Sequence, residues 1–302
     1  MPHRLVLTLT AALAALVLAP SVASACLRVG VYQDRPVTSF PRLADAVGPG
    51  VTTLSVYVGA RETIDPRLLA MARARHLLLV VAWQPDDRPA TLARVAHGRY
   101  DAALRRLVRQ LRSLPAAPIL RPMPEPNTPW YAWSGEVGGQ GGQRYVRAWR
   151  HVWRVVHRTP GGHRIRLLWT PYARSIPDEP VNRIARYFPG RPWVDAVGAV
   201  AYNFGQDDQL DWTAPRDLFA AAYAAIDPLA RKPFWLAETG STALGGSKAG
   251  WIGQLTGLRA AFPRLRGVLW YDVREENGDF RLRDATATTD AFRALAGTAC
   301  PS

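Results

Sequence analysis

Short apolar runs alternate along this chain with longer amphipathic stretches. The apolar runs have the length of β-strands, and the stretches between them carry apolar residues at helical spacing. This order is typical of parallel strands that are joined by helices and buried on both faces. We predict strands over 27–32, 53–58, 77–83, 119–123, 165–170, 196–202, 234–238 and 268–272. Eight such strands predict an α/β fold, a single-domain (β/α)8 TIM barrel.

Two of the stretches between strands show the helical pattern clearly. Segments 102–114 and 145–156 place Leu, Val, Trp and Ala on one face and Arg on the other. We expect helices that cover the barrel and expose their arginines. The chain carries a formal net charge of +14, but its 38 basic residues are scattered along the sequence. Because they form no block, we do not expect nucleic acid as a partner.

The N-terminal segment differs from the rest of the chain. A charged start precedes an apolar run over 5–19, and Ala23 and Ala25 are small residues typical of a cleavage site. The apolar run is shorter than the roughly 20 residues that span a bilayer. We therefore expect a secretory signal peptide over 1–25 and a secreted, extracellular domain over 26–302. We expect this domain to be a monomer without stable membrane insertion.

The chain has two cysteines, Cys26 and Cys300, near the two ends of the expected mature domain. In a β/α barrel the first strand begins and the last helix ends at the same face, so these residues should be neighbours. Because export permits oxidation, we predict a disulfide between them. A lipid anchor on Cys26 is the alternative. It is less favoured because Ala23 is small where a lipoprotein signal has a bulky aliphatic residue.

Polar and aromatic residues gather where the predicted strands end. Barrel enzymes place their active sites at the carboxyl ends of the strands. Glu125 follows the fourth strand and Glu238 ends the seventh, so they can face each other across the mouth. Glycoside hydrolysis needs two carboxyl groups of this kind, and aromatic rings offer flat apolar faces to sugars. A single strand-end glutamate is as often a surface or ion-paired residue, so this pattern alone is only suggestive.

The motifs around these residues are more specific when taken together. Segments 121–127 (RPMPEPN) and 130–133 (WYAW) are similar to the R-x-x-H-E-x-N and W-Y-x-W signature of glycoside hydrolase family 26, the β-mannanase family. Segment 187–203 resembles the Y-P-G, V-D-x-x-G and Y-N stretch of that family, and segment 237–251 resembles its nucleophile segment. The resemblance extends over about 98–272, with the motifs in the family order.

The resemblance implies a retaining double displacement by two glutamates. Glu125 would be the acid/base and Glu238 the nucleophile, with carboxyl groups roughly 5–5.5 Å apart. Arg121 would keep Glu238 ionised, and Tyr202 would hydrogen-bond to the same carboxylate. The further residues expected to bind substrate or to support the site are Asn127, Trp83, Trp130, Trp133, Trp169 and Trp270.

Pro124 stands where the family has a histidine, and this departure leaves the substrate open. We expect β-mannan first, with mixed-linkage β-glucan and β-1,3-xylan as alternatives. A second reading is a catalytically weak barrel that binds cell-wall or plant glycans, but an inward Glu238 with two polar partners favours the enzyme.

Cofactors and metals are not suggested by the sequence. None of its six histidines is spaced from a neighbouring carboxylate as metal ligands are. We therefore expect neither a metal nor another cofactor. The partner that we expect is a polysaccharide or oligosaccharide substrate.

Overall fold

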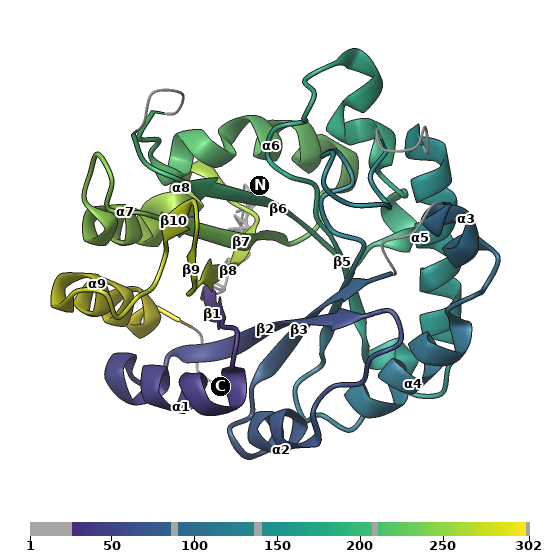
Figure 1. Cartoon of the computed structure of the whole chain (residues 1–302), viewed down its shortest axis with the longest axis horizontal. Helices are drawn as coiled ribbons and strands as arrows, with labels where there is room; N and C mark the ends of the chain where they lie inside the picture. The colour runs from purple at the N-terminus through teal and green to yellow at the C-terminus, as the bar shows by residue number, and fades with distance from the viewer. Residues whose placement is uncertain (1–25, 86–89, 136–140, 207–210, 300–302) are drawn as a thin grey trace, which may run out of the picture.

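The computed structural model describes residues 26–85, 90–135, 141–206 and 211–299, and the predicted signal peptide lies outside this part. Eight parallel strands form a closed barrel in which each strand pairs with the next and β8 pairs with β1. Figure 1 looks roughly along this barrel, with the helices around it. The predicted TIM barrel is confirmed. The division of the chain at residue 25 remains a prediction.

The strands agree with the predicted segments to within a few residues at each end. Their register carries a shift in the pairing of β6 with β7, at Ala199 and Val200. The strands are β1 Arg28–Tyr32, β2 Val51–Gly59, β3 Leu78–Gln84, β4 Ile119–Pro122, β5 Arg166–Trp169, β6 Ala196–Asn203, β7 Phe234–Ser241 and β8 Leu265–Tyr271. A short hairpin, β9 Arg274–Glu275 and β10 Gly278–Asp279, follows β8.

The helices lie outside the barrel and cover it, with apolar faces turned inward. In α5, for example, Tyr145, Trp149 and Val152 are fully buried, whereas Arg147 and Arg154 are exposed. The α-helices are α1 Pro36–Val47, α2 Pro66–Ala74, α3 Thr91–Ala96, α4 Asp101–Leu111, α5 Gly141–Arg158, α6 Pro215–Ala230, α7 Lys248–Gln254, α8 Leu258–Ala261 and α9 Thr286–Gly297. The 3-10 helices are η2 Gly162–Arg164, η3 Pro180–Asn182, η4 Ile184–Tyr187, η5 Arg191–Trp193 and η6 Leu255–Gly257.

The inside of the barrel is a packed core below its mouth. Its apolar side chains come from six strands, β3 to β8, and Trp235 of β7 is the largest of them. A Cβ on Gly267 of β8 would lie 2.2 Å from the Trp235 ring, so the neighbouring strand needs glycine there. The cluster comprises Leu78, Val80, Ile119, Leu168, Ala196, Trp235, Ala237 and Leu269. These side chains fill the interior of the barrel below the carboxyl ends of its strands.

The two ends of the described chain lie side by side. Leu27 and Ala299 form a parallel β-bridge, so the neighbours of both cysteines are in contact. Cys300 lies outside the described residues, and the disulfide to Cys26 stays a prediction. Within the described part of the chain, every helix is too short or too polar to cross a membrane.

Candidate active site

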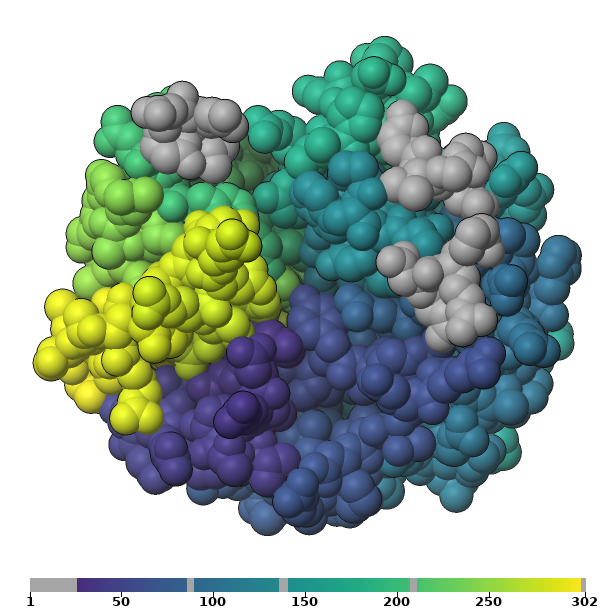
Figure 2. Space-filling view, in the orientation of Figure 1, coloured from purple at the N-terminus to yellow at the C-terminus, as the bar shows by residue number. Residues whose placement is uncertain are grey.

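A cavity of about 1520 Å³ opens at the carboxyl ends of the strands. Its lining includes the carboxyl groups of Glu125 and Glu238 and side chains from the segments that follow most of the strands. In Figure 2 the surface is hollowed at this mouth, between the yellow segment after β8 and the teal segments after β4 and β5. The volume exceeds that of ordinary small-ligand pockets, so it accommodates a ligand longer than one sugar ring.

The segment that follows β4 presents Glu125 through a strained turn. Met123 and Glu125 both adopt positive φ angles, 49° and 55°, which side chains other than glycine rarely take. Pro124 and Pro126 alternate with them and restrict the backbone on either side. Such strain persists only where the surroundings hold the conformation, and it gathers at functional sites.

The surroundings hold this turn through its carbonyl groups. Four consecutive carbonyl oxygens, of residues 123–126, each accept a hydrogen bond from outside the turn. The donors, in chain order of their acceptors, are the Tyr145 hydroxyl, the Trp133 indole, the Thr128 hydroxyl and the Gly135 amide. The amide of Glu125 also donates to Thr170 O at 2.8 Å. The carboxyl group of Glu125 is thereby aimed into the cavity by a fixed backbone.

Glu125 is 5 % exposed and has two polar neighbours. Its Oε2 accepts a 2.8 Å hydrogen bond from Trp130 Nε1, and its Oε1 lies 3.7 Å from Arg121 Nη2. Burial, and then the negative charge of Glu238, raise the pKa of Glu125 to about 7, although Arg121 and Trp130 oppose the shift. Glu125 therefore carries its proton at mildly acidic pH, as a general acid must.

A register shift in β7 positions Glu238. Ala199 of β6 pairs with Leu236, but Val200 pairs with Glu238, so Ala237 is an extra residue in β7. Ala237 packs inside the barrel. Glu238 follows it directly in the strand and also lies on the inner side, where it lines the cavity. A bulge of this kind re-aims a side chain that strict alternation would turn to the other face.

The carboxylate of Glu238 receives three hydrogen bonds although it is only 2 % exposed. Oε2 accepts from Arg121 Nη1 at 2.8 Å and from the Tyr57 hydroxyl at 2.5 Å. Oε1 accepts from the hydroxyl of Tyr202. Burial, followed by the charge of Glu238, raises the pKa of both tyrosines well above 10, so both remain donors. Both oxygens of the Glu238 carboxyl group are thus held in place by charged or phenolic donors.

Arg121 connects the two glutamates. Its side chain is fully buried in β4, with Nε donating to Thr170 and Nη1 to Glu238. Nη2 makes no hydrogen bond to the described residues and lies 3.7 Å from Glu125 Oε1. One guanidinium thus reaches both carboxyl groups. The pKa of Glu125 is raised, and Glu238 is held by three hydrogen-bond donors, so the two groups have different environments, as acid and nucleophile roles require.

Tyr57 is the main site residue absent from our sequence predictions. The period-two pattern of β2 contains a signal for it, because Thr53, Ser55 and Tyr57 alternate with Leu, Val and Val. Further aromatic rings around Glu238 are those of Tyr32 and Tyr271, stacked at 5.1 Å between centroids. Tyr271 lines the cavity and is a flat ring available to a sugar.

Three tryptophans predicted at the site lie elsewhere, which corrects their assignment as substrate contacts. Trp83, Trp169 and Trp270 lie at or next to the ends of their strands but are buried in the layer between barrel and helices. Trp270, for example, packs edge-on against Trp251 of α7 and donates to Phe280 O. The reason is the pleat, which turns neighbouring residues to opposite faces. Tyr271, directly after Trp270, is the residue that faces the cavity.

The remaining predicted residues divide into one cavity residue and two supports. Trp130 is 46 % exposed and lines the cavity beside Glu125. Trp133 is buried beneath the loop, where it stacks on Tyr131 and holds Pro124 O. Asn127 is fully buried and exchanges hydrogen bonds with the backbone of Tyr172. Trp133 and Asn127 therefore position the loops after β4 and β5 and do not line the cavity.

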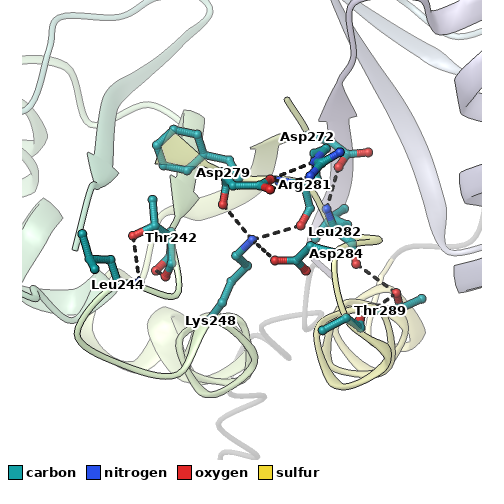
Figure 3. Close-up of polar contacts among 12 residues, drawn as sticks. Thr242, Leu244, Lys248, Asp272, Asp279, Arg281, Leu282, Asp284 and Thr289 are labelled. Atoms are coloured by element: carbon teal, nitrogen blue, oxygen red, sulfur yellow. Dashed lines mark hydrogen bonds and ion pairs between the residues drawn. The ribbon is translucent and has the colours of Figure 1, made fainter. Parts of the chain in front are cut away.

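The loop after β8 forms another wall of the cavity through Glu275, Asn277 and Phe280. Lys248, at the start of α7, fixes this loop from below (Figure 3). Its buried ammonium group donates to Asp279 O at 2.7 Å, to Arg281 O at 3.1 Å and to the Asp284 carboxylate at 2.5 Å. Because a single cation binds all three acceptors, the wall keeps one position relative to α7.

Comparisons with known proteins agree with this geometry. The sequence profile described as glycosyl hydrolase family 26 matches residues 87–226, which include Arg121 and Glu125. A relative, Endoglucanase H of Acetivibrio thermocellus, is 24 % identical over 227 residues. The predicted resemblance to glycosyl hydrolase family 26 is confirmed, and with it the predicted enzyme class of glycosidase at the level of the family.

The relatives differ from the chain in length and sequence. The match covers 73 % of this chain but only 24 % of Endoglucanase H, so the chain spans about a quarter of that protein. Among solved structures, the catalytic domain of a Bacillus sp. JAMB-750 endo-β-1,4-mannanase superposes with a TM-score of 0.68 at 14 % identity, covering 90 % of this chain and 86 % of that one. A modular endo-β-1,4-mannanase from Cellulomonas fimi gives 0.65 at 18 % identity, covering 90 % and 70 %. At these identities the structures show the shared fold.

Proposed function

We propose that this chain is a retaining glycoside hydrolase that cleaves a neutral β-linked polysaccharide, with Glu125 as acid/base and Glu238 as nucleophile. The observation that carries the proposal is the buried guanidinium of Arg121, in reach of both carboxyl groups. A retaining mechanism needs the two carboxyl groups close enough for direct attack on the sugar. An inverting mechanism needs room for a water molecule between carboxylate and sugar, which a shared contact disfavours.

In the first step Glu125 donates its proton to the leaving oxygen while Glu238 attacks the anomeric carbon. The bond to the leaving oxygen breaks, a glycosyl ester forms on Glu238, and the carboxylate loses its negative charge. That charge is one of the causes that raise the pKa of Glu125. Its loss lowers the pKa of Glu125, which then accepts a proton from the water that hydrolyses the ester.

The hydrogen bonds around Glu238 suggest which oxygen attacks. Oε2 is held by both Arg121 and Tyr57, whereas Oε1 is held by Tyr202 alone. An attacking oxygen must exchange a hydrogen bond for the new bond to carbon, and Oε1 has only one to exchange. We therefore assign Oε1 as the attacking atom and Oε2 as the carbonyl oxygen of the ester.

The charges of the cavity favour a neutral substrate. Its described lining carries six carboxyl groups but only two arginines, in a chain whose net charge is +14. A polysaccharide of uronic acids would meet like charges there. Among neutral polymers, β-mannan is our first candidate because the two superposed structures are named as mannanases. Mixed-linkage β-glucan is the next, because the relative is named as an endoglucanase, and β-1,3-xylan is a third.

Reducing-sugar release from β-mannan, galactomannan, mixed-linkage β-glucan and β-1,3-xylan tests this function. We expect release from at least one polymer, and we expect Glu238→Gln to abolish it. Glu276→Gln is a matched control, since Glu276 is exposed in the loop after β8 and does not line the cavity. Binding without release by the wild-type chain would contradict catalysis and favour a glycan-binding barrel. Equal activity of Glu238→Gln and Glu276→Gln would remove Glu238 from the nucleophile role.

We also propose that the chain is exported with cleavage after Ala25. The support is the apolar segment over 5–19 followed by the small residues Ala23 and Ala25. N-terminal sequencing of protein recovered from the medium of an expressing bacterium should begin at Cys26. Recovery of the uncleaved chain from the cytoplasm alone would contradict export.

A further inference from the structure

One flank of α6 lies open because the connection between β5 and β6 is irregular. This connection is described throughout and contains no α-helix, only the 3-10 helices η3, η4 and η5. Four prolines between residues 177 and 192 explain the absence, since proline removes a helical hydrogen bond and clashes within a helix. A standard barrel would place a full helix beside α6 here. Instead the short helix η4 contacts α6, and residues of both line a depression.

The catalytic cavity continues into this depression, which we call the α6 furrow. Leu218, Ala221 and Ala225 of α6 line one side, and Ile184 and Ala185 of η4 line the other. Ala185, Ala221 and Ala225 are exposed, so the furrow is open to solvent. From Leu218 to Ala225 the helix rises by about 10 Å, which makes the furrow longer than one sugar ring. The furrow and both catalytic glutamates line one continuous cavity.

The chemistry of the furrow suits a neutral, hydroxyl-rich chain. Its floor consists of small or aliphatic side chains, which allow close approach. Its rims carry exposed groups of both signs, Asp178 and Asp217 with Arg174 and Arg183. Carboxylates accept hydrogen bonds from hydroxyl groups and guanidinium groups donate to them, while their opposite charges balance. A polyanion or a polycation would meet charges of its own sign as well as of the opposite sign among these four residues.

We propose that the α6 furrow binds the same polysaccharide chain beyond the point of cleavage, so that the polymer leaves the mouth between the loop after β5 and helix α6. The proposal rests on the proposed hydrolase function, because the occupant is inferred from the continuity of the furrow with the catalytic cavity. The proposal makes a specific prediction. The rate at which polymers are cleaved should depend on the furrow, whereas the rate for a short substrate that fills only the catalytic centre should not.

Filling the furrow tests the proposal. Ala221→Trp and Ala225→Trp place a large ring on its floor, and Ala220→Trp places the same ring on another, exposed face of the same helix that does not line the cavity. The three changes carry the same small cost in helix propensity. We expect kcat/KM on galactomannan or mixed-linkage β-glucan, whichever the wild type cleaves, to fall about tenfold or more in the two furrow variants, as the loss of one sugar's contacts implies.

An activated aryl glycoside of the matching sugar separates the furrow from the catalytic centre. All three variants should hydrolyse it at the wild-type rate and melt at the same temperature. Wild-type polymer cleavage by Ala221→Trp and Ala225→Trp would overturn the furrow proposal alone. Equal loss in Ala220→Trp would also overturn it. A wild-type chain inactive on every polymer and aryl glycoside would overturn the proposed function and the furrow with it.

Discussion

Glu125 should set the alkaline limb of the pH profile. Burial and the charge of Glu238 raise its pKa to about 7. As the general acid it must hold a proton before the first step, so kcat/KM should fall about tenfold per pH unit above that value. The assay of this limb needs a polysaccharide substrate, because its leaving group is poor and its leaving oxygen must be protonated by Glu125.

Trp130 offers a way to move this limb. Its indole donates to Glu125 Oε2 at 2.8 Å, which favours the ionised form and lowers the pKa of Glu125. A hydrogen bond to a charged group contributes about 1.5–3 kcal/mol, and one pKa unit corresponds to about 1.4 kcal/mol. Because Trp130 is 46 % exposed, water replaces part of the lost bond. Trp130→Phe should therefore raise the limb by about 0.5–1 pH unit.

The assay is kcat/KM against pH between about 5 and 9, a range centred on the raised pKa, for the wild type and two variants. Trp133→Phe is the matched control, since its indole donates to the Pro124 carbonyl and not to the carboxyl group. Its limb should stay at the wild-type position even if the rate falls. A limb that stays in place or moves downward in Trp130→Phe would refute the account of how Glu125 is tuned.

Three further predictions concern stability, catalysis and the ends of the chain. Between about pH 4.5 and 7 the folded chain binds a proton at Glu125 that the unfolded chain releases, so the free energy of unfolding falls as pH rises. Glu125→Gln removes this titration. Its free energy of unfolding, measured with denaturant, should exceed that of the wild type by up to about 3 kcal/mol at pH 8 but by little at pH 5. Tyr57→Phe should lower kcat/KM about 10- to 100-fold through the lost bond to Glu238, with unchanged melting temperature; wild-type kinetics would exclude the role. Reduction should raise the intact mass by about two hydrogens and lower the melting temperature if Cys26 and Cys300 are bridged; an unchanged mass would contradict the disulfide.

The fold was predictable from sequence because every strand is a compact apolar run between polar or helical segments. All eight runs became barrel strands. The connection between β5 and β6 differs from the standard βα unit, since its prolines replace a helix by 3-10 turns. Its consequence, an open flank of α6, depends on tertiary packing and was not visible along the chain.

The site residues could be predicted where a family motif contains them. They were harder to predict where the direction of a side chain in its strand decides whether it reaches the cavity. Glu125, Glu238, Arg121 and Tyr202 meet at the mouth as expected. The strand-end tryptophans were misassigned because hydrophobic runs buried on both faces do not reveal which residue points inward. Tyr57 shows the converse. The alternation of β2 marked its face, but only the barrel brings it to Glu238, which is 181 positions away in sequence.

The most direct test of the central claim is to trap the glycosyl ester on Glu238. Incubation with activated 2-deoxy-2-fluoro glycosides of mannose, glucose and xylose slows hydrolysis of the ester, and mass spectrometry of peptides then locates the added sugar. The account predicts one fluoroglycosyl group per chain, on the peptide that contains Glu238, and none in Glu238→Gln. Attachment to another residue, or turnover of these compounds with inversion at the anomeric carbon, would contradict it.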